Sequence, residues 1–166
     1  MGDRYDVLRP NQITASIASL PSRWRGAFRI DPDLDIDIED LFTVAAKDGT
    51  SLAEHCAAVI AQLGVLRDAI RTTTYPVPET LDDQVAAAVA NRGSGPWPSS
   101  AREALNAISA ELNSLSEQLR LVKTNDWKKA ATCGGTSFTV IQLAQGTSRV
   151  AADRLRAVEY LVAELT

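Results

Sequence analysis

The sequence predicts an all-α protein: a four-helix bundle with up-down topology and long crossover connections. Four segments repeat apolar residues at intervals of three and four, and three of them hold long seams. With 166 residues, 45% of them hydrophobic and 23% charged, the chain fits one globular domain covering residues 1–166.

The first predicted helix runs from about Thr14 to Arg29, and Pro21 falls inside it, so the helix begins or kinks there. Residues 31–40 then alternate acidic and aliphatic side chains, a two-residue period that predicts extended chain. A calcium loop needs a glycine and a terminal glutamate that this run lacks, so we expect a solvated edge segment.

The second helix has the clearest start, because Ser51 and Glu54 form a capping box, and it should end near Thr72. A short helix follows from Thr80 to about Asn91. Residues 93–99 are a loop by composition, and Trp97 within it is either a lid over the bundle end or a binding-surface aromatic.

The third long helix begins at Ser100, where Glu103 completes a second capping box. After a connector over residues 127–136, the last helix should run from Ser137 to the C-terminus. Gly146 lies inside that helix and predicts a close approach by another backbone, or a kink.

Composition excludes several function classes. A net charge of −4 gives no basic footprint for nucleic acid, and no run of about 18 apolar residues predicts a membrane span. Without a recognisable signal peptide we expect a cytoplasmic protein, with Cys56 and Cys133 as free thiols. A single histidine excludes a metal held by several histidines of one chain.

The order of features resembles a known family. Trp24 in the first helix is followed by Ser51-Leu52-Ala53-Glu54-His55, then by Asn125-Asp126-Trp127, then by a long helix over 139–158. This order is similar to the DinB-like family of metal-dependent bundles, which includes mycothiol-dependent maleylpyruvate isomerase, and it covers nearly the whole chain. The resemblance implies a divalent metal, Zn or Ni, held by one histidine on the second helix and two ligands four residues apart on the last.

His55 matches the first of these ligands, but the last helix does not supply the other two. In either register, Gly146 with Val150 or Val150 with Arg154, the expected pair has no ligand. From Gln142 onward the strong ligand types are Asp153, Glu159 and Glu164, and no two are four apart. We therefore expect no metal or other cofactor, with His55 as a remnant ligand.

Several side chains remain candidates, each with a structural alternative. His55 is a general base or remnant ligand, or a half-buried imidazole bonded to a neighbour. Cys56 lies on the apolar seam, whereas Cys133 precedes the predicted last helix, where a thiol can become reactive. Arg149 and Asp153 are spaced as an ion pair, which together with Arg154 forms either ordinary surface or an anion pocket.

Two functions follow. In the first, the chain has lost its metal and is a non-catalytic binding or regulatory module that forms a homodimer. In the second, it is a transferase or isomerase that uses a small-molecule thiol of the mycothiol type. The thiol would bind in a cleft lined by His55, Arg149, Asp153 and Arg154, with His55 and Cys133 as the catalytic candidates.

Overall fold

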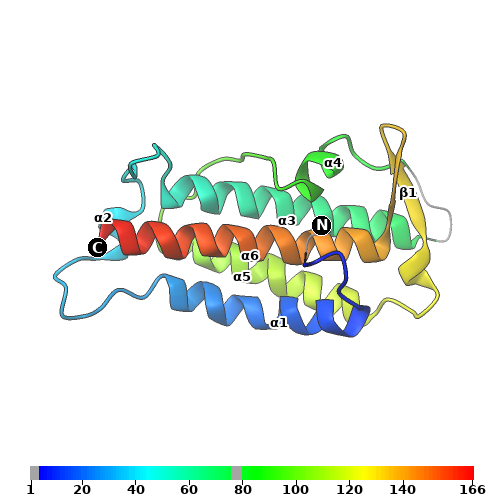
Figure 1. Cartoon of the computed structure of the whole chain (residues 1–166), viewed down its shortest axis with the longest axis horizontal. Coiled ribbons are helices and arrows are strands. Elements are labelled where there is room, and N and C mark those ends of the chain that lie inside the picture. The colour runs from blue at the N-terminus through cyan, green and yellow to red at the C-terminus, as the bar shows by residue number, and fades with distance from the viewer. Residues whose placement is uncertain (1–3, 76–79) are drawn as a thin grey trace.

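A computed structural model describes residues 4–75 and 80–166, and it shows four long helices lying side by side (Figure 1). They are α1 (Pro10–Ala27), α3 (Leu52–Thr74), α5 (Ala101–Arg120) and α6 (Val140–Leu165). Both α1 and α3 pack against α5 and α6, so the helices form a closed ring around one core. The predicted all-α class is confirmed.

The first helix starts earlier than predicted, at Pro10, and continues through Pro21. Pro10 occupies the first turn, where backbone N–H groups have no partner within the helix, so the missing N–H of proline costs no hydrogen bond. The interpretation that the helix begins at Pro21 is therefore wrong. Trp24 is fully buried, and its ring meets Phe28 edge-on with 6.4 Å between ring centres.

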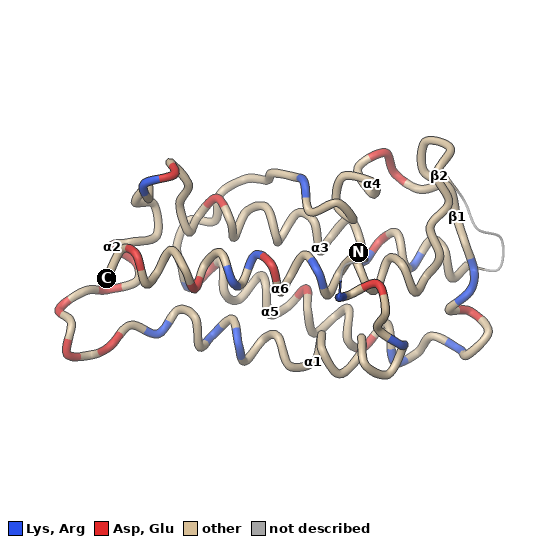
Figure 2. Tube along the Cα trace, viewed as in Figure 1, with Lys and Arg blue, Asp and Glu red and all other residues tan. Residues whose placement is uncertain are grey.

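The acidic segment is not uniformly extended, because it contains the short helix α2 (Ile38–Leu41). The side chain of Asp37 caps α2 by accepting a hydrogen bond from the Glu39 N–H at 3.0 Å. The Glu39 carboxylate in turn accepts from the N–H groups of Ala101 at 2.8 Å and Arg102 at 3.0 Å. The alternating pattern failed as a predictor because two of its acids, Asp37 and Glu39, bind helix N-termini, at the acidic end of the bundle (Figure 2).

The capping residues locate two helix starts correctly. Ser51 and Glu54 form the predicted reciprocal box at 3.2 Å in both directions. Ser100 accepts from the Glu103 N–H at 3.0 Å, but the Glu103 carboxylate binds the Ser99 N–H instead of closing a box with Ser100.

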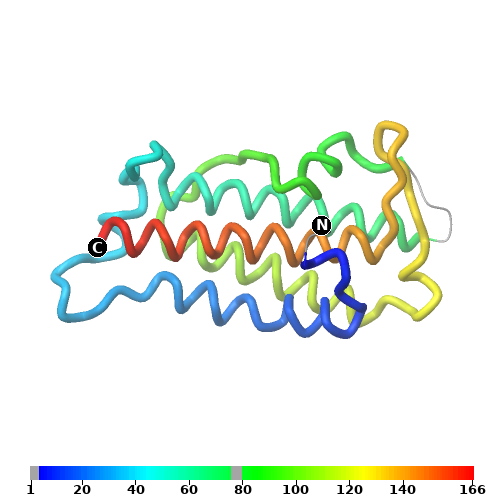
Figure 3. The backbone as a smooth tube through the Cα atoms, in the orientation of Figure 1, coloured from blue at the N-terminus to red at the C-terminus, as the bar shows by residue number. Residues whose placement is uncertain are grey.

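The connection from α3 to α5 is a long crossover. It includes α4 (Gln84–Val89) and then returns along α3, so α3 and α5 run in the same direction and the up-down alternation is interrupted there (Figure 3). A Cβ added at Gly95 would lie 2.9 Å from the Ala57 carbonyl oxygen, so this segment of the crossover packs directly against α3. Earlier in the crossover, Val89 Cα lies 3.7 Å from a Cβ built on Gly146, which confirms the predicted close approach of a backbone.

The predicted connector after α5 folds into a 3-10 turn, η1 (Asp126–Lys128), and a hairpin of β1 (Ala130–Cys133) and β2 (Thr136–Thr139). Gly134 and Gly135 have φ of 55° and 82°, as a two-residue hairpin turn requires. The last helix consequently begins at Val140, three residues later than predicted. Its cap is a box between Thr139 and Gln142 that the sequence reading missed.

Candidate functional site: the cleft beside His55

Three segments meet at His55, which lies in the second turn of α3. The Arg154 guanidinium of α6 reaches the His55 ring, with 3.1 Å between Nη1 and Nδ1. Arg154 also donates from Nε to Asn91 Oδ1 at 3.1 Å and from Nη2 to the Asn91 carbonyl at 3.3 Å. One guanidinium thus joins α6, α3 and the crossover.

Asn91 is held in an unusual backbone conformation. Its φ of 56° lies in the left-handed region, which asparagine tolerates better than most residues. The buried Gln62 supports it: with the amide oriented to satisfy both ends, Nε2 donates to the Ala58 carbonyl and Asn91 Oδ1, while Oε1 accepts from the Arg92 N–H. Hydrogen bonds from Gln62 of α3 therefore stabilise the turn in which Asn91 contacts Arg154.

His55 and Arg154 border a cleft of about 180 Å³. Trp97 lines it and is 53% exposed, so its ring is not packed as a lid over the bundle end. The full lining is Thr50, Glu54, His55, Ala57, Ala58, Gly93, Ser94, Gly95, Trp97 and Arg154.

The environment favours the neutral form of the imidazole. Burial, followed by the positive charge of Arg154, lowers the pKa of His55 below its ordinary 6.5, while Asp48 and Glu54 act in the opposite direction. Because Nδ1 faces a guanidinium donor, it must accept, so the ring proton is assigned to Nε2. Burial also lowers the pKa of Arg154, whose guanidinium nonetheless stays charged.

This arrangement predicts how stability varies with pH. The unfolded chain binds a proton at the single histidine more readily than the folded chain, so the free energy of unfolding should fall as pH drops below about 6.5. In His55→Gln that part of the loss should vanish. Urea unfolding of both proteins at a series of pH values checks this, and equal slopes below pH 6.5 would contradict it.

The remaining residues of the predicted cleft lie elsewhere. Arg149 forms an ion pair with Asp6 and donates to the Val89 carbonyl at 3.3 Å, whereas Asp153 is paired with Arg156. Each residue of an α-helix rotates the side-chain direction by about 100° around the helix axis. Asp153, one position before Arg154, and Arg149, five positions before it, therefore project from different sides of α6 than Arg154 does. The prediction that His55, Arg149, Asp153 and Arg154 share one cleft is wrong for Arg149 and Asp153, which do not line it.

Neither cysteine is placed for chemistry with His55. Cys56 is fully buried in the core, and burial raises the pKa of its thiol to about 12. Cys133 is buried at the end of β1, and its thiol donates to the Asp82 carbonyl at 3.2 Å. Since β2 separates it from the start of α6, the helix-terminus reason for a reactive Cys133 is removed.

Over residues 4–75 and 80–166, no three histidine, cysteine, aspartate or glutamate side chains gather closely enough to hold a metal ion. The guanidinium of Arg154 instead contacts Nδ1 of the His55 imidazole. Sequence reasoning missed Asn91 as part of this site, because its helix-ending position gave no sign that its side chain binds Arg154.

Comparison with protein-family models, with curated proteins and with solved structures found no significant match to this chain. Within the part of the chain that the structure describes, no helix combines the length and apolarity needed to cross a bilayer.

Proposed function

We propose that this protein is a non-catalytic binding module that takes a small carboxylate or phosphate anion into the His55 cleft. The observation that carries the proposal is the 3.1 Å contact between Arg154 Nη1 and His55 Nδ1. It engages the imidazole lone pair that a metal or an abstracted proton would otherwise use.

The polar groups that the cleft presents to a ligand are mainly hydrogen-bond donors. His55 Nε2–H has no partner among the described residues, and Arg154 uses only three of its five N–H groups in the bonds to His55 and Asn91. Ser94 adds a hydroxyl. The Glu54 carboxylate also lines the cleft, but it is engaged by the Ser51 N–H. An anion is the ligand that such a donor set recognises.

The size of the cleft supports a small ligand. Pockets for drug-sized molecules span about 300–1,000 Å³, and this cleft holds about 180 Å³. A thiol cosubstrate of the glutathione or mycothiol type would extend beyond it. The exposed ring of Trp97 provides an apolar wall for the non-ionic part of the ligand.

The lone histidine makes the test direct, because its ring protons give a single set of NMR signals. We expect acetate or inorganic phosphate to shift these signals saturably, and Arg154→Gln to weaken binding by about tenfold or more, as loss of a charge-assisted bond does. Arg71→Gln removes an exposed arginine from the far end of α3 and should leave the titration unchanged.

Equal binding by Arg154→Gln and the unchanged protein would contradict the proposal, as would no shift with either anion. Stoichiometric zinc or nickel that is lost in His55→Ala would favour a metal site. Saturable glutathione binding at the same ring signals would favour the thiol-dependent enzyme.

A further inference from the structure

A second cavity lies in the groove between α1 and α6, where the N-terminal segment closes one end. It holds about 540 Å³ and shares no lining residue with the His55 cleft. Its walls come from three separate parts of the chain, and each of them contributes an arginine. The lining residues are Arg4, Tyr5, Leu8, Ser16, Arg23, Ala152, Arg156 and Glu159.

Tyr5 fixes two of the three arginines. Its side chain is only 7% exposed, and its hydroxyl accepts hydrogen bonds from Arg4 Nη2 at 2.7 Å and from Arg156 Nη2 at 3.2 Å. The Arg4 guanidinium also lies 4.9 Å from the centre of the Tyr5 ring. A buried phenol therefore holds two cations at the groove without neutralising either of them.

Among the described residues, the groove carries more positive than negative charge. Arg156 is paired with Asp153, but the described residues give no carboxylate partner to Arg4 or Arg23. Glu159 is the one acid in a lining that carries three arginines, although the chain as a whole has a charge of −4. Figure 2 shows basic positions along the middle of α6 and toward the end of α1.

We propose that this groove binds a small molecule bearing a diphosphate or another closely spaced phosphate pair. Planar guanidinium groups bind phosphate oxygens through two parallel bonds, and arginines reaching the groove from different segments can engage adjacent phosphates. A volume of about 540 Å³ lies within the range of small-molecule pockets. Phosphate charge would also relieve the repulsion among the three guanidinium groups.

Calorimetry with inorganic pyrophosphate at low salt tests this. We expect Arg23→Gln to weaken binding about tenfold, as loss of a charge-assisted contact does, while Arg4→Gln acts in the same direction. Arg25→Gln is the matched control, because it removes the same charge from the same helix at an exposed position outside the groove. Arg154→Gln should keep full pyrophosphate affinity, which separates this site from the His55 cleft.

Three results would overturn the proposal. They are no saturable binding of pyrophosphate, equal weakening by Arg23→Gln and Arg25→Gln, or loss of binding in Arg154→Gln. Sedimentation with phosphatidic acid vesicles distinguishes a lipid headgroup from a soluble phosphate. Vesicle binding without pyrophosphate binding would contradict a soluble ligand.

Discussion

Trp24→Ala is expected to lower the free energy of unfolding by about 3–5 kcal/mol. The Trp24 indole is completely buried between the helices and contacts Phe28. Its removal leaves a cavity that the closely packed helices cannot fill. Chemical denaturation monitored by circular dichroism measures the loss.

Trp97→Ala is the matched control, because it deletes the same side chain where it is 53% exposed. Its effect on stability should stay within about 0.5 kcal/mol. Trp24→Phe should lose less than Trp24→Ala, since it keeps most of the apolar volume and removes an indole N–H that has no partner among the described residues. Equal destabilisation by Trp24→Ala and Trp97→Ala would contradict the assigned core.

Gly95→Val should destabilise the protein by about 1–3 kcal/mol, as overpacking does, and should also abolish anion binding at the His55 cleft. A Cβ at residue 95 would lie 2.9 Å from the Ala57 carbonyl oxygen and 3.0 Å from Ala61 Cβ, both on α3. The crossover would have to lift from α3, and one wall of the cleft would move with it.

The control is Gly64→Ala, in the interior of α3, where an added Cβ meets nothing within 4 Å. This substitution should stabilise the protein by about 1 kcal/mol through helix propensity alone. Urea unfolding and the histidine NMR titration together measure both variants. Full anion binding by Gly95→Val would show that the crossover does not shape the site.

The features that the sequence predicted well are those encoded locally. Apolar spacing located the four long helices, and Ser51 with Glu54 located the start of α3. Each of these signals is formed by residues that lie only a few positions apart in the sequence. The acidic segment was misread because the partners of Glu39, the N–H groups of Ala101 and Arg102, lie more than 60 residues away.

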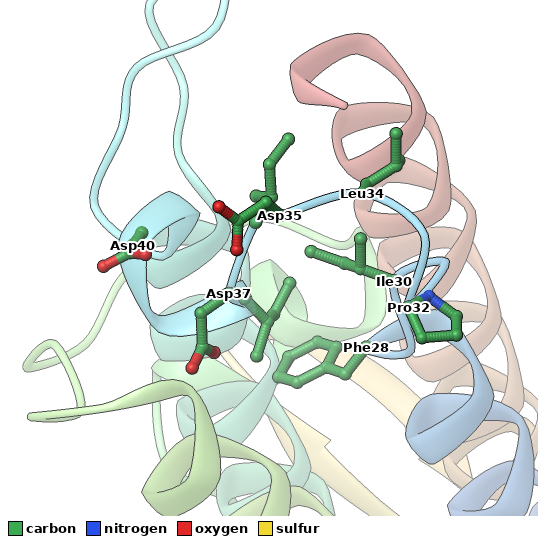
Figure 4. A pocket seen from close by; sticks show the side chains of 9 residues that line it. Phe28, Ile30, Pro32, Leu34, Asp35, Asp37 and Asp40 are labelled. Atoms are coloured by element: carbon green, nitrogen blue, oxygen red, sulfur yellow. The ribbon is translucent and has the colours of Figure 1, made fainter.

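The candidate site was only half predictable for the same reason. His55 and Arg154 were both singled out, but their contact spans 99 residues and has no spacing to reveal it. The ion pairing of Arg149 depends on Asp6, which no helical period connects to α6. The hollow that the acidic segment lines together with Phe28, where Asp35, Asp37 and Asp40 lie on the α2 side of Ile30, likewise depends on how a loop folds back over Phe28 (Figure 4).

The attachment of the N-terminal segment to α6 has a consequence for synthesis on the ribosome. Gln145 Nε2 donates to the carbonyls of Asp6 and Leu8, both at 3.1 Å, and Arg156 donates to the Tyr5 hydroxyl. Residues 5–8 are made before the four long helices, yet their binding surface on α6 is made after the other three. The apolar faces of α1, α3 and α5 therefore remain partly uncovered until α6 has been made. The bundle can assemble completely only after α6 has left the exit tunnel.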